Sequence, residues 1–80
     1  MYFVYVLKSH VDGRLYKGMT KNIETRIYEH NTGKNKSTRP YKPWILVYSK
    51  EFETREEARK HEKWLKSGIG REFLKSILVP

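Results

Sequence analysis

The feature that most constrains this chain is its dependence on aromatic side chains in the absence of any cysteine. Two tryptophans, six tyrosines and three phenylalanines occur among 80 residues, with no cysteine. A chain this short is close to the lower limit at which one apolar core stabilises a fold, and each aromatic side chain buries a large area. Disulfides and thiolate zinc sites are excluded. We therefore predict a single domain over residues 1–80, stabilised by packing alone.

The charge balance is strongly basic, with 17 Lys and Arg against 9 Asp and Glu and a formal net charge of +8. Such an excess on a small surface attracts polyanions, so it favours a nucleic-acid partner, DNA first. A surface that serves only solubility stays open as the alternative, and an anionic membrane surface is a weaker one. No segment reaches the roughly twenty apolar residues of a membrane span, and the apolar start lacks the features of a signal peptide. We therefore expect a cytoplasmic protein.

The start of the chain predicts a β-hairpin. Residues 2–8 and 14–19 have the β-branched and aromatic composition of strands, and an Asp-Gly turn signal lies between them. Side chains alternate along a strand, so a loop with an even number of residues would place Tyr5 and Tyr16 on the same face. A four-residue loop at 9–12 would set these two side chains directly opposite each other.

A helix is predicted after the hairpin. Asn22 is a suitable N-cap, and the helix is expected to run to about Asn31 and to stop at Gly33, the usual residue after a helix end. Arg26 and His30 are four residues apart, so they share one face of this helix. On its own, such a pair is typical of a solvated helix face.

The next two segments differ sharply in composition. Residues 33–43 hold two prolines, one glycine, four cationic side chains and no acid, which predicts an exposed basic loop. Residues 44–48 form a continuous apolar run, which predicts a central strand buried on both faces.

The end of the chain predicts two more helices. Thr54 and Glu57 form a capping box that opens a helix running to about Lys66, and Gly68 and Gly70 are expected to break the chain before a short final amphipathic helix. The element order is therefore β-β-α-β-α-α. We predict an α/β (α+β) fold, with a three-stranded antiparallel sheet at the centre flanked by helices.

One acidic residue occupies an unexpected position. Ala58, Glu62 and Leu65 lie at helical spacing, which places Glu62 on the core-facing stripe of the second long helix. A lone buried carboxylate usually shifts its pKa or finds a cation. A structural salt bridge with one of the many basic side chains, or a position at the rim of the stripe, stays open as the ordinary explanation.

Five features occur in a fixed order along the chain: two short strand motifs that contain Tyr5 and Tyr16, a helix with Arg26 and His30, a helix with Glu62, and the segment 65–74. In this order they resemble the GIY-YIG nuclease superfamily, which includes the N-terminal domain of excinuclease C. The first motif falls on Phe3-Val4-Tyr5 and the second on Tyr16-Lys17-Gly18, with Phe3 and Lys17 departing from the usual residues. The helical segment 26–31 follows, then a helix whose Glu62 matches the metal-binding glutamate. Residues 65–74 are similar to the tail of the small stand-alone YazA/YhbQ-like group.

The resemblance implies hydrolysis of DNA phosphodiester bonds by an endonuclease with one divalent cation, Mg²⁺ or Mn²⁺. Glu62 would be the metal ligand, Arg26 would hold the phosphate, and either Tyr5 or Tyr16 would act as general base or assist it, with His30 able to accept or relay its proton. A role in DNA repair or recombination would follow. The alternatives are a catalytically weak or inactive nucleic-acid-binding module of the same fold, and a domain that docks on a protein partner in a repair complex.

The expected contacts with the nucleic-acid backbone form a second set. Gly18 would allow the backbone to approach the sugar-phosphate closely. Cations on the second strand and the basic loop would contact phosphates, with neutral donors beside them, or the loop would be merely solvated and mobile. These residues are Lys17, Lys34, Lys36, Arg39 and Lys42, with Ser37 and Thr38 as the neutral donors.

Overall fold

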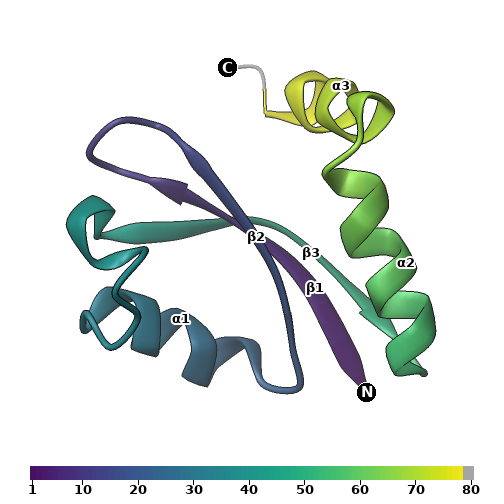
Figure 1. The fold of residues 1–80 in the computed structure, drawn as a ribbon, viewed down its shortest axis with the longest axis horizontal. Helices are drawn as coiled ribbons and strands as arrows, with labels where there is room; N and C mark the ends of the chain where they lie inside the picture. Colours follow the sequence, from purple (N-terminus) through teal and green to yellow (C-terminus); the bar gives the residue numbers. More distant parts are fainter. Residues whose placement is uncertain (79–80) are drawn as a thin grey trace.

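A three-stranded antiparallel sheet forms the centre of the structure, a computed structural model that describes residues 1–78 (Figure 1). Figure 1 shows this sheet between α1 on one side and α2 with α3 on the other. The described residues confirm the predicted α+β class and the order β-β-α-β-α-α. The elements are β1 (Tyr2–Ser9), β2 (Leu15–Thr20), α1 (Ile23–Asn31), β3 (Trp44–Phe52), α2 (Arg55–Leu65) and α3 (Gly68–Ile77), with a 3-10 helix at Arg39–Tyr41.

The central strand is β1, so the prediction that residues 44–48 form the central strand was wrong. The strand order is β2-β1-β3, and β3 lies at an edge. Ile45 and Leu46 of β3 are 51% and 38% exposed, whereas Val4 to Leu7 of β1 are all buried. Both segments are continuous apolar runs of similar length. An apolar run indicates a buried strand, but it does not tell which of two such strands is the central one. Pairing with both neighbours places β1 in the middle.

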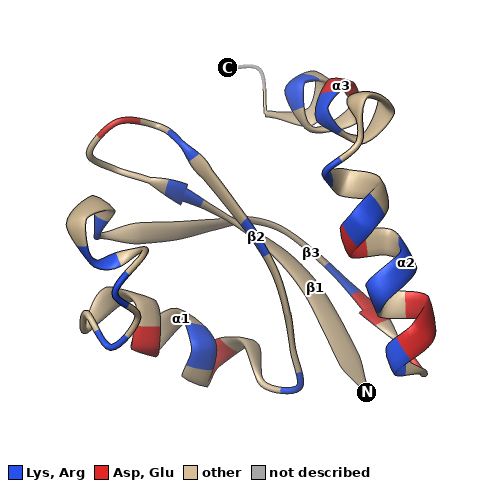
Figure 2. Ribbon diagram, in the orientation of Figure 1, with Lys and Arg blue, Asp and Glu red and all other residues tan. Residues whose placement is uncertain are grey.

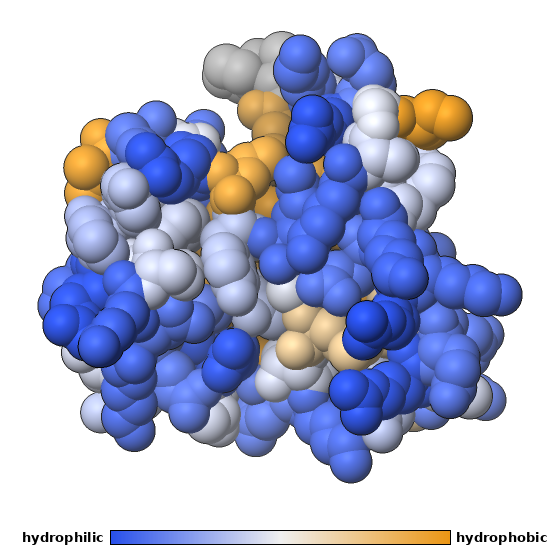
Figure 3. All heavy atoms as spheres, viewed as in Figure 1, coloured by the Kyte–Doolittle hydropathy of each residue, from blue (hydrophilic) through white to orange (hydrophobic). Residues whose placement is uncertain are grey.

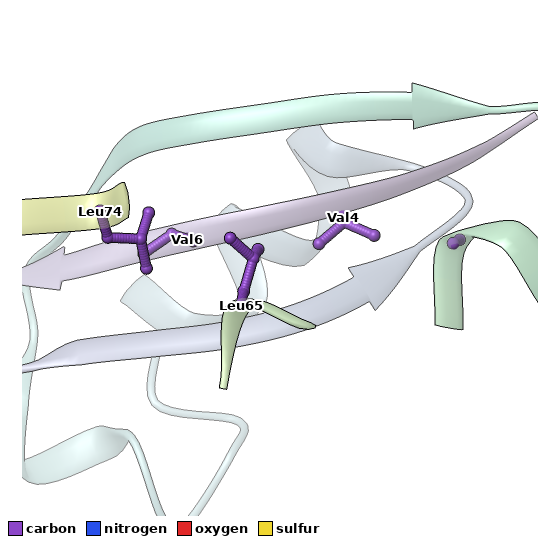
Figure 4. Packing of buried hydrophobic residues seen from close by; sticks show 5 residues of the cluster. Val4, Val6, Leu65 and Leu74 are labelled. Atoms are coloured by element: carbon purple, nitrogen blue, oxygen red, sulfur yellow. The ribbon is translucent and has the colours of Figure 1, made fainter. Parts of the chain in front are cut away.

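Alternation along β1 divides the interior into two parts. Val4 and Val6 point to the face covered by α2 and α3, where they form an apolar cluster with Ala58, Leu65 and Leu74 (Figure 4). Burial of such a side chain contributes about 1.5–3 kcal/mol to stability. We call this cluster the apolar core.

The opposite face of β1 has a different composition. Tyr5 and Leu7 point toward α1 and the segment that follows it, and they pack with Trp44. Tyr16 and Ile27 are partly buried against this second cluster. It is largely aromatic and, unlike the apolar core, it contains polar atoms that must find hydrogen-bond partners.

The hairpin register explains where the two tyrosines lie. Lys8 pairs with Leu15 and Leu7 pairs with Tyr16, so the connection is longer than the four residues that would set Tyr5 opposite Tyr16. Their shared face is as expected for a loop with an even number of residues, but Tyr16 lies diagonally from Tyr5. The turn is closed by hydrogen bonds between Ser9 and the residues that follow it, the Gly13 N–H donating to the Ser9 carbonyl at 2.9 Å.

The three helix starts depend on local side-chain caps. Asn22 and Thr54 accept hydrogen bonds from the backbone N–H groups of Thr25 and Glu57, as predicted. Gly68 and Gly70, expected to break the chain, instead lie in the first turn of α3, because Ser67 caps that helix. No helix in the described part of the chain is long and apolar enough to cross a membrane.

Candidate active site

The hydroxyl of Tyr5 is the meeting point of the candidate site. Its oxygen lies 3.2 Å from His30 Nε2, and Arg26 Nε lies 3.4 Å from it on the other side. Tyr5 comes from the central strand, whereas Arg26 and His30 come from successive turns of one face of α1. The pair Arg26 and His30, whose spacing in the sequence was typical of a solvated helix face, therefore points toward the sheet. Three of the five predicted catalytic side chains form one hydrogen-bonded group.

Tyr5 reaches the edge of the sheet by passing over Gly18 of β2. A Cβ atom at position 18 would lie 2.5 Å from the Tyr5 hydroxyl oxygen and 2.6 Å from the ring carbon that bears it. Heavy atoms do not tolerate such distances, so any larger residue at position 18 would displace the phenol ring. The structural requirement for glycine here is the approach of Tyr5.

Tyr5 belongs to a series of hydrogen bonds that begins at Arg26 and ends at the carbonyl oxygen of Asn35, and the direction of each bond follows from these two end groups. Arg26 only donates, so it donates to Tyr5 Oη. At the other end, Thr38 Oγ1 lies 2.8 Å from His30 Nδ1 and 3.4 Å from the carbonyl oxygen of Asn35, which only accepts. Thr38 thus donates to Asn35 and accepts from His30 Nδ1–H. His30 Nε2 then accepts the Tyr5 proton, which assigns the imidazole tautomer.

The electrostatics of the site favour the neutral forms of Tyr5 and His30 beside the charged Arg26. Burial raises the pKa of Tyr5 and outweighs the hydrogen bond from Arg26, which lowers it; Tyr16 and Glu62 add to the rise. Burial, followed by the charge of Arg26, lowers the pKa of His30. The guanidinium favours the ionised phenol, but because Tyr5 is 1% exposed, this effect is smaller than that of burial.

Tyr16 lies against this group without being part of its hydrogen bonds. Its ring centroid is 4.8 Å from that of His30 and 6.3 Å from that of Tyr5. The side chain is partly buried, and its hydroxyl makes no hydrogen bond with any residue in the range 1–78. The two tyrosines therefore have different surroundings, a distinction that their motifs alone do not make.

A comparison of the sequence with models of known protein families gives a match over most of the chain. The model of one protein family, described as the GIY-YIG catalytic domain, matches residues 1–71. The chain belongs to the GIY-YIG family. The predicted resemblance is confirmed, and because this is a family of nucleases, a nuclease-like function is supported.

Relatives of the GIY-YIG chain extend over almost its whole length. A UPF0213 protein of Staphylococcus haemolyticus is 39% identical over 77 residues, covering 95% of this chain and 93% of the relative. One of Staphylococcus saprophyticus is 40% identical with the same coverage. The solution NMR structure of a UPF0213 protein from Bacillus halodurans is 36% identical, has a TM-score of 0.58, and aligns with 98% of this chain and 86% of that one. These small relatives agree with the predicted stand-alone group.

Glu62, which the resemblance predicts to be the metal ligand, lies at the rim of the apolar core. Ala58 and Leu65 on the same stripe are fully buried, whereas the Glu62 side chain is 20% exposed and pairs with Lys66 at 3.5 Å. This is the ordinary arrangement that the sequence left open. Glu62 nevertheless contributes to the rise in the pKa of Tyr5, so its charge acts on the site from the α2 side of the sheet.

The donor set suits a cation that keeps most of its waters. Within residues 1–78, no group of three or more His, Asp or Glu side chains is placed to hold a metal ion. Glu62 offers a single carboxylate. Mg²⁺ is commonly bound by one or two carboxylates together with water and substrate phosphate, so the residues present fit such an ion.

The basic loop is anchored more firmly than its composition suggests. Thr38 is 2% exposed, its carbonyl oxygen accepts from Trp44 Nε1 at 2.9 Å, and its hydroxyl is bonded to His30. It is therefore not available as a phosphate donor, contrary to expectation. The neighbouring cations keep their exposure, and Arg39 is oriented by a 2.8 Å hydrogen bond from its Nε to the Gly33 carbonyl. The loop cations in question are Lys34, Lys36, Arg39 and Lys42.

Three residues of the site were missed or misassigned from sequence. Glu29 pairs with Arg26 at 3.2 Å and orients the guanidinium, and its i, i+3 spacing was a usable signal. Asn35 and Thr38 complete the hydrogen bonds of His30, but they lie in a loop, where no periodicity identifies contacts. Beside these residues, a hollow of about 240 Å³ is lined by Arg26, Glu29, His30, Lys34 and Asn35.

Proposed function

We propose that this chain is a divalent-metal-dependent endonuclease that hydrolyses DNA phosphodiester bonds. The observation that carries the proposal is the placement of Arg26, between the buried Tyr5–His30 pair and the hollow beside Lys34. Its side chain is 39% exposed. Its Nε and one terminal nitrogen are engaged by Tyr5 and Glu29, which leaves further N–H donors for a phosphate oxygen.

Arg26 is held in place before substrate arrives, and this favours catalysis. A guanidinium fixed by Tyr5 and Glu29 does not have to reorganise when charge develops on the phosphorus centre. Removing one such preorganised donor typically raises the barrier by about 3 kcal/mol, a rate effect of about a hundredfold or more.

We assign the contact with the attacking water to Tyr16. The Tyr5 proton is committed to His30, and burial raises the pKa of Tyr5, so this residue is a poor base. The Tyr16 hydroxyl is not engaged by any described side chain and adjoins the same group. In this assignment Tyr5 and His30 are positioning residues that hold Arg26 and the ring of Tyr16.

Glu62 would hold the cation, which we propose to be Mg²⁺ or Mn²⁺. When bound, the cation would supply positive charge at the leaving oxygen and activate water. The ion pair between Glu62 and Lys66 is partly exposed and 3.5 Å long, so it contributes little to stability and can exchange for a stronger partner.

The decisive experiment compares two carboxylate variants on a panel of branched, damaged and single-stranded DNA substrates. Glu62→Gln should abolish cleavage in Mg²⁺ or Mn²⁺, while DNA affinity in EDTA stays the same or increases, because a negative charge is removed. Glu72→Gln is the matched control: Glu72 is also a helical carboxylate beside a lysine, at 3.9 Å from Lys75. It should retain cleavage. Equal cutting by wild type and Glu62→Gln would show that the nuclease proposal is wrong.

One observation favours a second function, a nucleic-acid-binding module with weak or no turnover. Glu62 already has a lysine partner one turn away, as in an ordinary structural pair. This second function predicts salt-dependent DNA binding by the wild type with no cleavage of any substrate in the panel. A role in DNA repair or recombination, with a protein partner in a repair complex, would be consistent with either function.

A further inference from the structure

A second hollow lies on the other face of the hairpin, away from the Tyr5–His30 pair. It has a volume of about 570 Å³ and lies between the hairpin and α3, with Leu15, Leu74 and Leu78 among its lining residues. Figure 3 shows orange, apolar atoms between the hairpin and α3, bordered by blue, hydrophilic ones. This volume is within the range of roughly 300–1,000 Å³ that is typical of ligand pockets. We call it the hairpin groove.

Cations surround the leucine floor of the hairpin groove. Lys8 and Lys17 come from the hairpin, and Arg71 and Lys75 come from α3. Figure 2 shows blue positions on both of these parts of the chain. No carboxylate is among the described residues that line the groove. Burial, then the charges of Arg71 and Lys66, lowers the pKa of Lys17, as expected where positive charges crowd together. Glu72, the nearest acid on α3, is 77% exposed and 3.9 Å from Lys75, so it neutralises little of this charge.

The hairpin groove and the candidate active site lie on opposite faces of the edge strand β2 and meet at that strand. Lys17 stands between Tyr16 and Gly18 on the edge strand β2, and alternation directs its side chain to the opposite face from Tyr16. Lys66, which pairs with Glu62, is close enough to affect the pKa of Lys17. A polyanion at the site can therefore cross the β2 edge and continue into the groove.

We propose that the hairpin groove binds the single-stranded flank of a DNA substrate, with phosphates on the rim cations and an unstacked base on the leucine floor. Duplex DNA offers the same phosphates, but its bases are stacked inside and cannot cover an apolar floor. A single strand supplies both an anionic backbone and an exposed base face. The inference rests on the DNA-binding part of the proposed function and extends it to the strand leading away from the cut.

The test is a binding measurement that does not depend on cleavage. Fluorescence anisotropy in EDTA would compare a short oligothymidylate with a duplex of equal length, for wild type and for Arg71→Gln/Lys75→Gln. Both substituted residues are exposed on α3, so the fold should be retained. We expect single-strand affinity to fall roughly tenfold or more at low salt, and the slope of log K against log salt to decrease by about 1.4 for two lost contacts.

A matched control removes the same charge elsewhere. Lys60→Gln/Lys63→Gln substitutes two exposed lysines of α2 that are not among the groove-lining residues. Its single-strand affinity should fall much less than that of the α3 variant, because these two lysines do not line the groove and so would not contact the bound phosphates. Lys8→Gln, on the hairpin wall of the groove, should weaken binding in the same direction as the α3 variant. Equal losses in both double variants would overturn the proposal, and so would an equal loss of duplex binding in the α3 variant.

Failure of this inference and failure of the nuclease proposal give different results. If wild type cuts DNA but Arg71→Gln/Lys75→Gln binds the single strand normally, the groove assignment is wrong and the nuclease stands. If wild type cuts nothing but the α3 variant loses single-strand affinity, the groove stands and the chain is a binding module.

Discussion

The two faces of the central strand β1 are equally buried but are stabilised in different ways. Val4 and Val6 on one face and Tyr5 and Leu7 on the other are all 1% exposed or less. The first pair meets the apolar core under α2 and α3, where packing alone holds the side chains. On the second face, Tyr5 and its partners are joined by hydrogen bonds whose directions are determined from end to end. One strand therefore provides both the stability of the fold and the alignment of the site.

The difference has a practical consequence for mutations. Truncation on the apolar core removes packing and should reduce the free energy of unfolding. Removal of a polar atom on the α1 face should have a smaller effect on stability. It should have a larger effect on the orientation of the site residues, because each hydrogen-bonded side chain there holds its neighbour in position.

The largest stability effect is expected on the apolar core. Leu65→Ala should lower the free energy of unfolding by about 2–5 kcal/mol, since Leu65 is fully buried and its replacement leaves a cavity. Urea denaturation followed by circular dichroism measures this. Ile69→Ala, at a position of α3 that is 72% exposed, is the control and should change stability by about 0.5 kcal/mol or less. Equal effects in the two variants would contradict the assignment of the core.

On the α1 face, Arg26→Gln should separate activity from stability. Cleavage should fall by about a hundredfold or more, corresponding to about 3 kcal/mol of barrier. Unfolding should change by about 1 kcal/mol or less, because the Arg26–Glu29 pair is partly exposed. Single-turnover cleavage and urea denaturation would be measured on the same preparation. A stability loss as large as that of Leu65→Ala would mean that both faces act through packing.

Tyr5→Phe tests whether the hydrogen bonds on this face have the assigned directions. The ring remains but the hydroxyl is lost, so the buried Nε2 of His30 loses its donor and stability should fall by about 1–3 kcal/mol. Nitrogen chemical shifts of the imidazole report the tautomer: wild type should show a protonated Nδ1 and an unprotonated Nε2. A wild-type imidazole protonated on Nε2 would refute the assigned directions.

The smallest effect concerns pH. Burial lowers the folded-state pKa of His30, so the unfolded chain binds more protons once the pH falls below about 6.5, the ordinary histidine pKa. The His30 contribution to stability is complete above that pH and is lost as the pH falls toward the lowered folded-state pKa.

A second histidine, on the α2 side, contributes to the pH dependence of stability in the same direction. Burial, followed by the charge of Lys50, also lowers the pKa of His61. His61 Nε2 is hydrogen-bonded to the hydroxyl of Tyr48 at 2.8 Å. His30→Gln and His61→Gln should each remove part of the stability loss that sets in below about pH 6.5, measured as the free energy of unfolding against pH. An unchanged pH dependence in His30→Gln would show that His30 does not contribute.

Local signals account for what was predictable from the sequence. The caps at Asn22 and Thr54 depend on contacts within three residues, and the shared face of Tyr5 and Tyr16 depends only on whether the loop length is odd or even. The central position of β1 could not be predicted, because two strands had similar apolar runs. The hydrogen bond that His30 donates to Thr38 could not be predicted either, because a side-chain contact between a helix and a loop leaves no periodic pattern.

Gly18 shows why a site residue can look like a defect in its secondary structure. Strands favour β-branched and aromatic residues, and by that preference a valine or threonine would suit β2 better than glycine. Such a replacement would occupy the space through which the phenol of Tyr5 passes from the middle of the sheet to its edge. Consensus or computational design that optimises strand propensity would therefore improve β2 locally while displacing the group on which Arg26 and His30 converge. Any stabilised variant of this domain should leave position 18 unchanged.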